Sequence, residues 1–299
     1  MNQPLETAWR NAWPAAIGCW SRYTQLRTPL FCHTVADEKR EGLTSSFAMI
    51  RLLDHAVVVS LRQVLEMKIG GFPREILAHE VGHHVLCPGD LGDHARLIAR
   101  LRRGLPGQEA QAGLVANLYA DLLINDRLQR LGLSIAGVYA ALPRSEDKLW
   151  TFYMRIYEIL WSLQRKSLAA GLIEPALEGD AQLGAKLVKV YAKDWLKGAG
   201  RFAALVHPYL REDGGAAVRK LFKGWLDVDG GPGGDGIPDG LASLDDDEEE
   251  GNIHPALDPD LARDGVEAEA GEEDGTFGRN RRGSGRTNPH RQPSEYAEI

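Results

Sequence analysis

The sequence has few cysteines, no long apolar run and no secretion signal, and each absence excludes a class of protein. Its three cysteines, Cys19, Cys32 and Cys87, form no C-x-x-C pair, which excludes a disulfide framework and a cysteine-only zinc site. No segment reaches the roughly 18 apolar residues that a membrane span requires. Residues 1–20 lack a basic start and an apolar core, so a signal peptide is not expected. We therefore expect a cytoplasmic protein without a membrane partner.

Charge is divided unevenly along the 299 residues, whose net charge is −7. From Asp227 onward there are 20 acidic residues and 6 arginines, whereas residues 1–226 carry 22 acidic and 29 basic residues. A sequence rich in Gly, Pro and acids cannot bury enough apolar surface to offset the entropy lost on ordering. We therefore predict an N-terminal extension at 1–40, a folded domain at 41–226 and a disordered acidic tail at 227–299.

Apolar periodicity in the predicted domain indicates an α+β fold that is mostly helical. The β-rich runs at 46–52 and 56–61 flank a short polar loop and predict a small antiparallel sheet. Ser60, Pro73 and Asp93 are expected to begin the first three helices that follow, because each residue type is favoured at a helix start. Helices are expected at 60–68, 73–86, 93–103, 109–131, 145–168, 180–197 and 214–226.

The helix expected at 73–86 contains an H-E-x-x-H pattern, from His79 to His83. Residues four apart lie on one face of a helix, so the two imidazoles can share one ion. Zinc suits neutral imidazole nitrogens and lowers the pKa of a bound water towards neutrality. Glu80 lies next to His79 and can take a proton from that water. The pattern therefore predicts two zinc ligands and a general base for amide hydrolysis.

A third ligand is expected from a later helix. Asn117, Asp121 and Asn125 are spaced by four and form a polar stripe on an otherwise apolar helix. A buried stripe needs polar partners, which an ion and its surroundings supply. We predict Asp121 as the ligand, with Asn117 and Asn125 donating hydrogen bonds around the site. A solvent-facing stripe is the alternative interpretation, and Asp126 and Glu109 are the alternative ligands.

Two segments together resemble a known family. The sequences AHEVGHH at 78–84 and NLYADLLIN at 117–125 are similar to those of a bacterial metallopeptidase domain that is often joined to a von Willebrand A domain. The resemblance covers about residues 46–131. The H-E-x-x-H part is shared by many zincins, and the N-x-x-A-D-x-x-I-N part is more specific. The chain departs from the family in the length of the linker at 86–113.

The resemblance implies a zincin-like fold, in which a sheet precedes the metal-binding helix. It implies Zn²⁺ ligands at His79, His83 and Asp121 and a base at Glu80. A weaker resemblance connects HEVGHHVL and VANLYADLL to the ImmA/IrrE family of small cytoplasmic peptidases, which cleave regulators. That family would carry out the same chemistry.

We interpret the chain as a zinc-dependent metallopeptidase whose substrate is a protein or peptide. An extended substrate is expected to pair with the exposed edge of the hairpin. The alternative is a non-catalytic, zinc-stabilised adaptor that binds a protein partner through its acidic tail. The short basic segment at 96–103 is explained equally well as the charged outer face of a helix, so nucleic acid is not an expected partner.

Other residues near the motif are expected to be structural. His84 lies about 100° from His83 around the helix, too far round to share an ion. Tyr153 and Tyr157 belong to an aromatic stripe at helical spacing, which is typical of a core. Cys87 follows His83 by one turn, and a buried thiol is the simpler interpretation.

Overall fold

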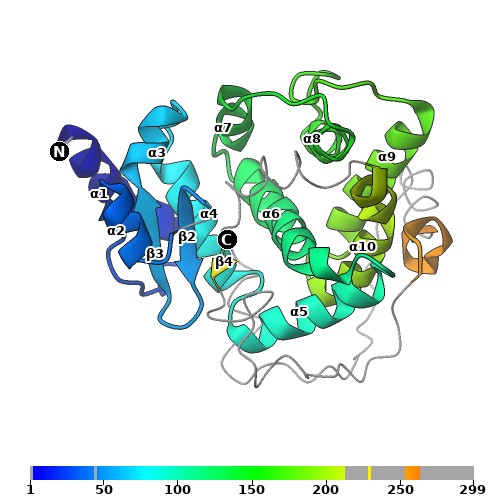
Figure 1. The fold of residues 1–299 in the computed structure, drawn as a ribbon, viewed down its shortest axis with the longest axis horizontal. Coiled ribbons are helices and arrows are strands. Elements are labelled where there is room, and N and C mark those ends of the chain that lie inside the picture. The colour runs from blue at the N-terminus through cyan, green and yellow to red at the C-terminus, as the bar shows by residue number, and fades with distance from the viewer. Residues whose placement is uncertain (1–2, 44–45, 213–227, 230–252, 263–299) are drawn as a thin grey trace, which may run out of the picture.

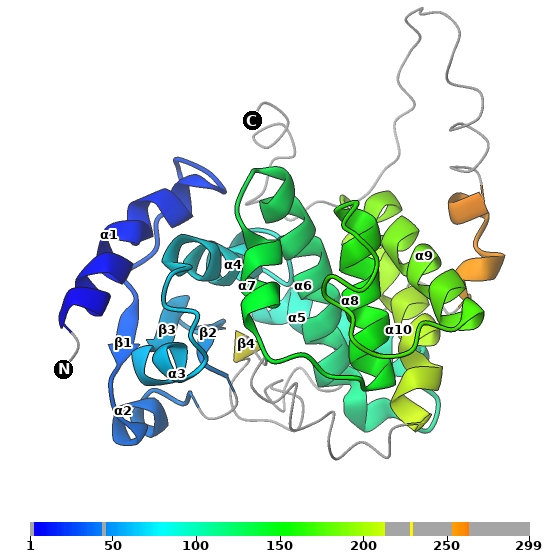
Figure 2. The same cartoon turned by 90° about the horizontal axis from the view of Figure 1, so that it is seen from above.

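The computed structural model describes residues 3–43, 46–212, 228–229 and 253–262. Within these ranges the chain is mostly helical and has one small sheet, which agrees with the predicted α+β class (Figures 1 and 2). The helix expected at 214–226 lies outside the described residues, as does most of the predicted acidic tail.

The two β-rich runs form an antiparallel hairpin, with β2 (Ala48–Arg51) paired to β3 (Ala56–Ser60) as predicted. The whole sheet is mixed, however, and its strand order is β1-β3-β2-β4. Both β1 (Leu30–Cys32) and β4 (Val228–Asp229) pair in parallel with their neighbours. The prediction of an antiparallel sheet is therefore right for the hairpin and wrong for the sheet, because the outer strands come from distant parts of the chain.

The pairing also covers part of each edge of the hairpin. β1 lies beside β3, with Leu30 opposite Val58, and β4 lies beside β2, with Val228 opposite Ile50. Since β4 covers β2 only at Ile50 and Arg51, the expectation that a substrate pairs with an open hairpin edge stays a prediction for the part of β2 at Ala48 and Met49.

Helices make up most of the remaining regular structure in the described ranges. Two short 3₁₀ helices, Glu109–Gln111 and Pro255–Leu257, accompany them. The α-helices are α1 (Gln3–Gly18), α2 (Val35–Arg40), α3 (Leu61–Glu66), α4 (Pro73–Val85), α5 (Leu91–Arg103), α6 (Ala112–Arg130), α7 (Ile135–Ala141), α8 (Lys148–Leu160), α9 (Pro175–Val190) and α10 (Trp195–Glu212).

Two of the three predicted helix starts are confirmed. The Ser60 side chain accepts a hydrogen bond from the Gln63 amide and caps α3, and α4 begins at Pro73. The predicted cap of α5 is wrong by three residues. Asp90 is the cap, and its side chain accepts from the amide of Asp93, which lies inside the first turn.

The single helix expected at 145–168 ends at Leu160, because the following loop folds around a buried carboxylate. Glu158 accepts hydrogen bonds from the amides of Lys166, Leu168 and Ala169 at 3.1, 2.8 and 2.8 Å. These amides would otherwise bond to helix carbonyls. The helix expected at 180–197 is likewise divided between α9 and α10.

The helix α4 lies between the sheet and α6 (Figure 1), and α1 also packs against α4. Trp20, just after α1, donates from Nε1 to the Ala78 carbonyl oxygen over 2.6 Å. A Cβ atom at Gly82 would lie only 2.6 Å from side-chain carbons of both Ile124 and Trp20. The missing side chain of Gly82 therefore allows α4 and α6 to approach closely, which sets the distance between their polar faces.

Among the helices of the described ranges, none is both long enough and apolar enough to cross a bilayer.

Candidate metal centre

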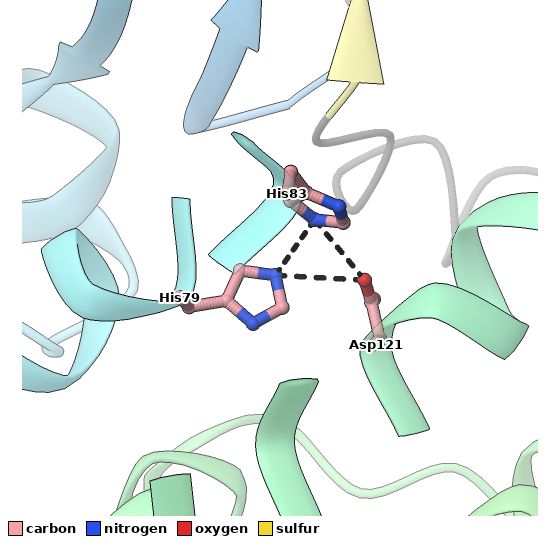
Figure 3. Close-up of side chains that lie close together, drawn as sticks. All are labelled: His79, His83 and Asp121. Atoms are coloured by element: carbon pink, nitrogen blue, oxygen red, sulfur yellow. Dashed lines mark hydrogen bonds and ion pairs between the residues drawn. The ribbon is translucent and has the colours of Figure 1, made fainter. Parts of the chain in front are cut away.

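Three side chains from α4 and α6 converge on one point (Figure 3). The Nε2 atoms of His79 and His83 lie 3.2 Å apart, and Oδ1 of Asp121 lies 3.5 and 3.4 Å from them, respectively. We call these three atoms the ligand triangle. Tetrahedral zinc holds N and O ligands at about 2.0–2.2 Å, so its ligand atoms lie about 3.3–3.6 Å from one another. The triangle therefore has the size that a single metal ion requires.

The polar stripe on α6 is buried rather than solvent-facing, so that alternative is wrong. Asn117, Asp121 and Asn125 are 5%, 2% and 3% exposed. Oδ2 of Asp121 accepts a hydrogen bond from Asn117 Nδ2 over 3.1 Å. Oδ1 is buried and accepts no hydrogen bond from any residue that the structure describes. A buried acceptor of this kind is costly unless a cation compensates for it.

The charge of Asp121 depends on two opposing effects. Burial raises its pKa, whereas the positive charge of His79 and His83 in their protonated forms, and the hydrogen bonds that they then donate, lower it, and the net shift is downward. An ionised carboxylate and two imidazoles are a chemically suitable set of donors for a divalent metal ion.

The outer nitrogens of both histidines are held by oxygen atoms. Nδ1 of His83 lies 3.0 Å from the Cys87 carbonyl oxygen, and Nδ1 of His79 lies 2.8 Å from Oδ1 of Asn125. A carbonyl oxygen can only accept, so each Nδ1 donates, and each neutral ring directs the Nε2 lone pair into the triangle. Two lone pairs and a carboxylate repel one another unless a positive charge lies between them. Cys87 acts here through its backbone, and its thiol is buried.

Glu80 is buried beside the triangle, with 1% of its surface exposed. It lines a cavity of about 30 Å³ together with Phe47, His79, Asn125 and Tyr139. A cavity of this size has room for a water molecule or two. Glu80 is therefore positioned beside a space in which its carboxylate can meet water.

The alternative ligands lie outside the triangle. Asp126 is buried and forms an ion pair with Arg130, and Glu109 is exposed in a 3₁₀ helix. The His84 ring packs against the ring of His55, with centroids 4.2 Å apart. Asp121 is thus the carboxylate that the fold brings to the two histidines.

The aromatic stripe on α8 is buried as predicted, but its hydroxyl groups have a polar role that sequence reasoning missed. Nδ2 of Asn125 donates to Oη of Tyr139 over 3.0 Å and to Oη of Tyr157 over 2.9 Å. The stripe indicates which face of α8 is buried, whereas its proximity to Asn125 depends on how α7 and α8 pack on α6.

Comparisons with known proteins identify no family for this site: no family model, curated protein or solved structure matches the sequence. A functional interpretation must therefore start from the residues of this chain.

Proposed function

We propose that the chain is a zinc-dependent metallopeptidase with a zincin-like arrangement of sheet and motif helix. In this proposal His79, His83 and Asp121 hold Zn²⁺, Glu80 is the general base, and the substrate is a protein or peptide. The ligand triangle carries the proposal, because its atoms come from two packed helices and are separated by 3.2–3.5 Å.

The number of ligands favours catalysis over a purely structural site. Structural zinc sites are closed by four protein ligands, whereas catalytic sites have three and keep one position open. Within the described ranges, the group of His, Cys and acidic ligands at this site has three members. The triangle therefore leaves space for water or a substrate oxygen.

The same set of two histidines and one carboxylate is also typical of non-haem iron sites. Glu80 favours zinc and hydrolysis, because a hydrolase needs a base beside the attacking water and a buried carboxylate meets that need. Metal analysis of the purified protein separates the two, since the proposal expects zinc at about one ion per chain.

The proposed chemistry assigns a task to each residue. A bound zinc ion would polarise the scissile carbonyl and make water more acidic. Glu80 takes the proton of the attacking water and passes it to the departing amine. Asn117 and Asn125 hold the side chains of Asp121 and His79 in place through hydrogen bonds of 3.1 and 2.8 Å.

The deciding experiment compares Glu80→Gln with the unaltered protein. The amide keeps the size of the side chain but cannot accept the proton, so turnover of a quenched-fluorescent peptide library should fall by about 10²–10⁴-fold. Zinc content should stay near one ion per chain. Glu75→Gln is the matched control, since Glu75 lies on the same helix and lines the same cavity.

Two results would contradict the proposal. Undiminished turnover in Glu80→Gln would remove Glu80 from the role of base. If the unaltered protein binds zinc but cleaves no peptide in the library, the adaptor interpretation replaces the peptidase, and the ion then only stabilises the fold.

A further inference from the structure

Three buried tyrosine hydroxyls and the Asn125 amide form one hydrogen-bonded group behind His79. Tyr139 comes from α7, and Tyr153 and Tyr157 come from α8. Oη of Tyr157 lies 2.9 Å from that of Tyr153 and 3.2 Å from that of Tyr139. Asn125 Nδ2 reaches the hydroxyls of both Tyr139 and Tyr157. None of the three tyrosines belongs to the ligand triangle.

A backbone carbonyl sets the direction of these hydrogen bonds. Tyr153 donates its hydroxyl proton to the Leu118 carbonyl oxygen over 3.1 Å, and this oxygen can only accept. Tyr153 has no second proton, so Tyr157 must donate in the bond between them. The only hydroxyl proton of Tyr157 is used in that bond, so Tyr139 must donate in the bond between Tyr139 and Tyr157.

This order of donors permits one orientation of the Asn125 amide. With Nδ2 towards the tyrosines, its two N–H groups donate to Tyr139 and Tyr157, and every contact has one proton. In the reversed orientation, Oδ1 would face the Tyr157 oxygen at 2.9 Å with no proton between them, because the Tyr157 proton is used at Tyr153. Oδ1 of Asn125 must therefore face His79.

We propose that Tyr153 and Tyr157 are positioning residues that hold His79 as the tautomer with its proton on Nδ1. Asn125 transmits the constraint, because its Oδ1 can only accept from His79 Nδ1 over 2.8 Å. Nε2 of His79 is then left with a lone pair directed into the ligand triangle. The proposal rests on the proposed function only in taking His79 as a metal ligand.

The environment keeps the tyrosines in the form that this order requires. Burial raises the pKa of Tyr153 and Tyr157 far above the usual range, and the charge of Asp121 raises that of Tyr157 further. Both hydroxyls therefore keep their protons at neutral pH.

Tyr153→Phe tests the inference without touching Asn125 or His79. The variant releases the Tyr157 proton, which can then be donated to a reversed Asn125 amide. Reversed, the amide offers N–H to Nδ1 of His79 and favours the tautomer with the proton on Nε2, which leaves no lone pair on Nε2 for a metal ion in the ligand triangle. Tyr157→Phe releases the same constraint by removing a partner of Asn125.

Two measurements test the expected changes in the His79 tautomer and in zinc affinity. Nitrogen NMR of metal-free protein labelled at histidine should show His79 protonated at Nδ1 in the unaltered chain and a mixture of tautomers in both variants. Zinc affinity, measured by competition with a chelator, should fall by about 10-fold or more, as is typical when a partner of a ligand is lost. Tyr119→Phe is the control, because it removes a buried hydroxyl that donates to the Trp195 carbonyl on α10.

An unchanged His79 tautomer in both variants would overturn the inference, as would unchanged zinc affinity. The His79 tautomer is measured in metal-free protein, so an unchanged tautomer argues against this inference alone. Failure of the proposed function would instead appear as absence of zinc binding or turnover in the unaltered chain.

Discussion

Asn117 donates from Nδ2 to Oδ2 of Asp121 over 3.1 Å, one helical turn along α6. The bond engages one carboxylate oxygen and leaves Oδ1 facing Nε2 of His79 and His83. A rotation of the Asp121 side chain would break this bond, so Asn117 holds Oδ1 in the ligand triangle. This use of an amide to orient a ligand is typical of metal sites.

Replacing Asn117 by Leu should therefore weaken zinc binding without removing a ligand. We expect a loss of about 10-fold, because the Asp121 carboxylate is then free to rotate. Chelator competition measures the affinity, and circular dichroism monitors the fold. Unchanged affinity in a folded variant would show that Asn117 does not orient Asp121.

Two aspartates on α6 allow a matched test of the third ligand. Asp121→Asn keeps the shape of the side chain but removes its charge, and we expect zinc affinity to fall by more than the roughly 10–100-fold that follows loss of a supporting partner. Asp126→Asn should retain zinc, because Asp126 is equally buried but pairs with Arg130. Equal losses in both variants would argue that general destabilisation, and not ligation, is being measured.

The close contact of α4 with α6 predicts a strong effect at Gly82. A Cβ atom there would lie 2.6 Å from side-chain carbons of Ile124 and Trp20, so in Gly82→Ala these side chains and their packing against α4 must shift. We expect a destabilisation of about 1–3 kcal/mol, measured by urea unfolding, together with weaker zinc binding. Gly179→Ala on α9 is the control, because its added methyl group would meet no described residue beyond its own helical turn within 4 Å. Its helix should become slightly more stable.

The segment at 253–262 is held on the helices by Asp258, which predicts a pH dependence. Burial raises the pKa of Asp258, but hydrogen bonds from Tyr191 Oη, at 2.6 Å, and the Asp260 amide, together with the Arg201 charge, hold it below its ordinary value. A carboxyl group whose pKa is lowered by folding stabilises the folded state above its unfolded pKa of about 3.9 and loses this contribution as pH falls through the folded value.

Asp258→Asn should remove this part of the pH dependence. The free energy of unfolding should differ most between Asp258→Asn and the unaltered protein at neutral pH, and this difference should shrink below about pH 4. Urea unfolding at a series of pH values measures it. Asp260→Asn, in the same segment, is the control, because the variant keeps the backbone amide that donates to Asp258. A constant difference between Asp258→Asn and the unaltered protein at all pH values would contradict the assignment.

Features that depend on neighbouring residues were predictable. The hairpin, the Ser60 cap and the start of α4 at Pro73 follow from local residue preferences, and all three are confirmed. The shared direction of His79 and His83 also follows from their spacing, because a helix repeats every 3.6 residues. The predicted cap at Asp93 was wrong because Asp90 caps the helix instead. The single helix predicted at 145–168 was wrong because the buried carboxylate of Glu158 binds backbone amides of the following loop.

Features that depend on packing between distant segments were not predictable from local pattern. Spacing in the chain left Asp121, Asp126 and Glu109 open as candidate ligands, and the docking of α6 on α4 across Gly82 brings Asp121 to the two histidines. The tyrosines behind Asn125 and the strands on both hairpin edges likewise come from segments far apart in the chain. Periodicity specifies which face of a helix is buried, but the partner of that face depends on the shapes of all the packed side chains together.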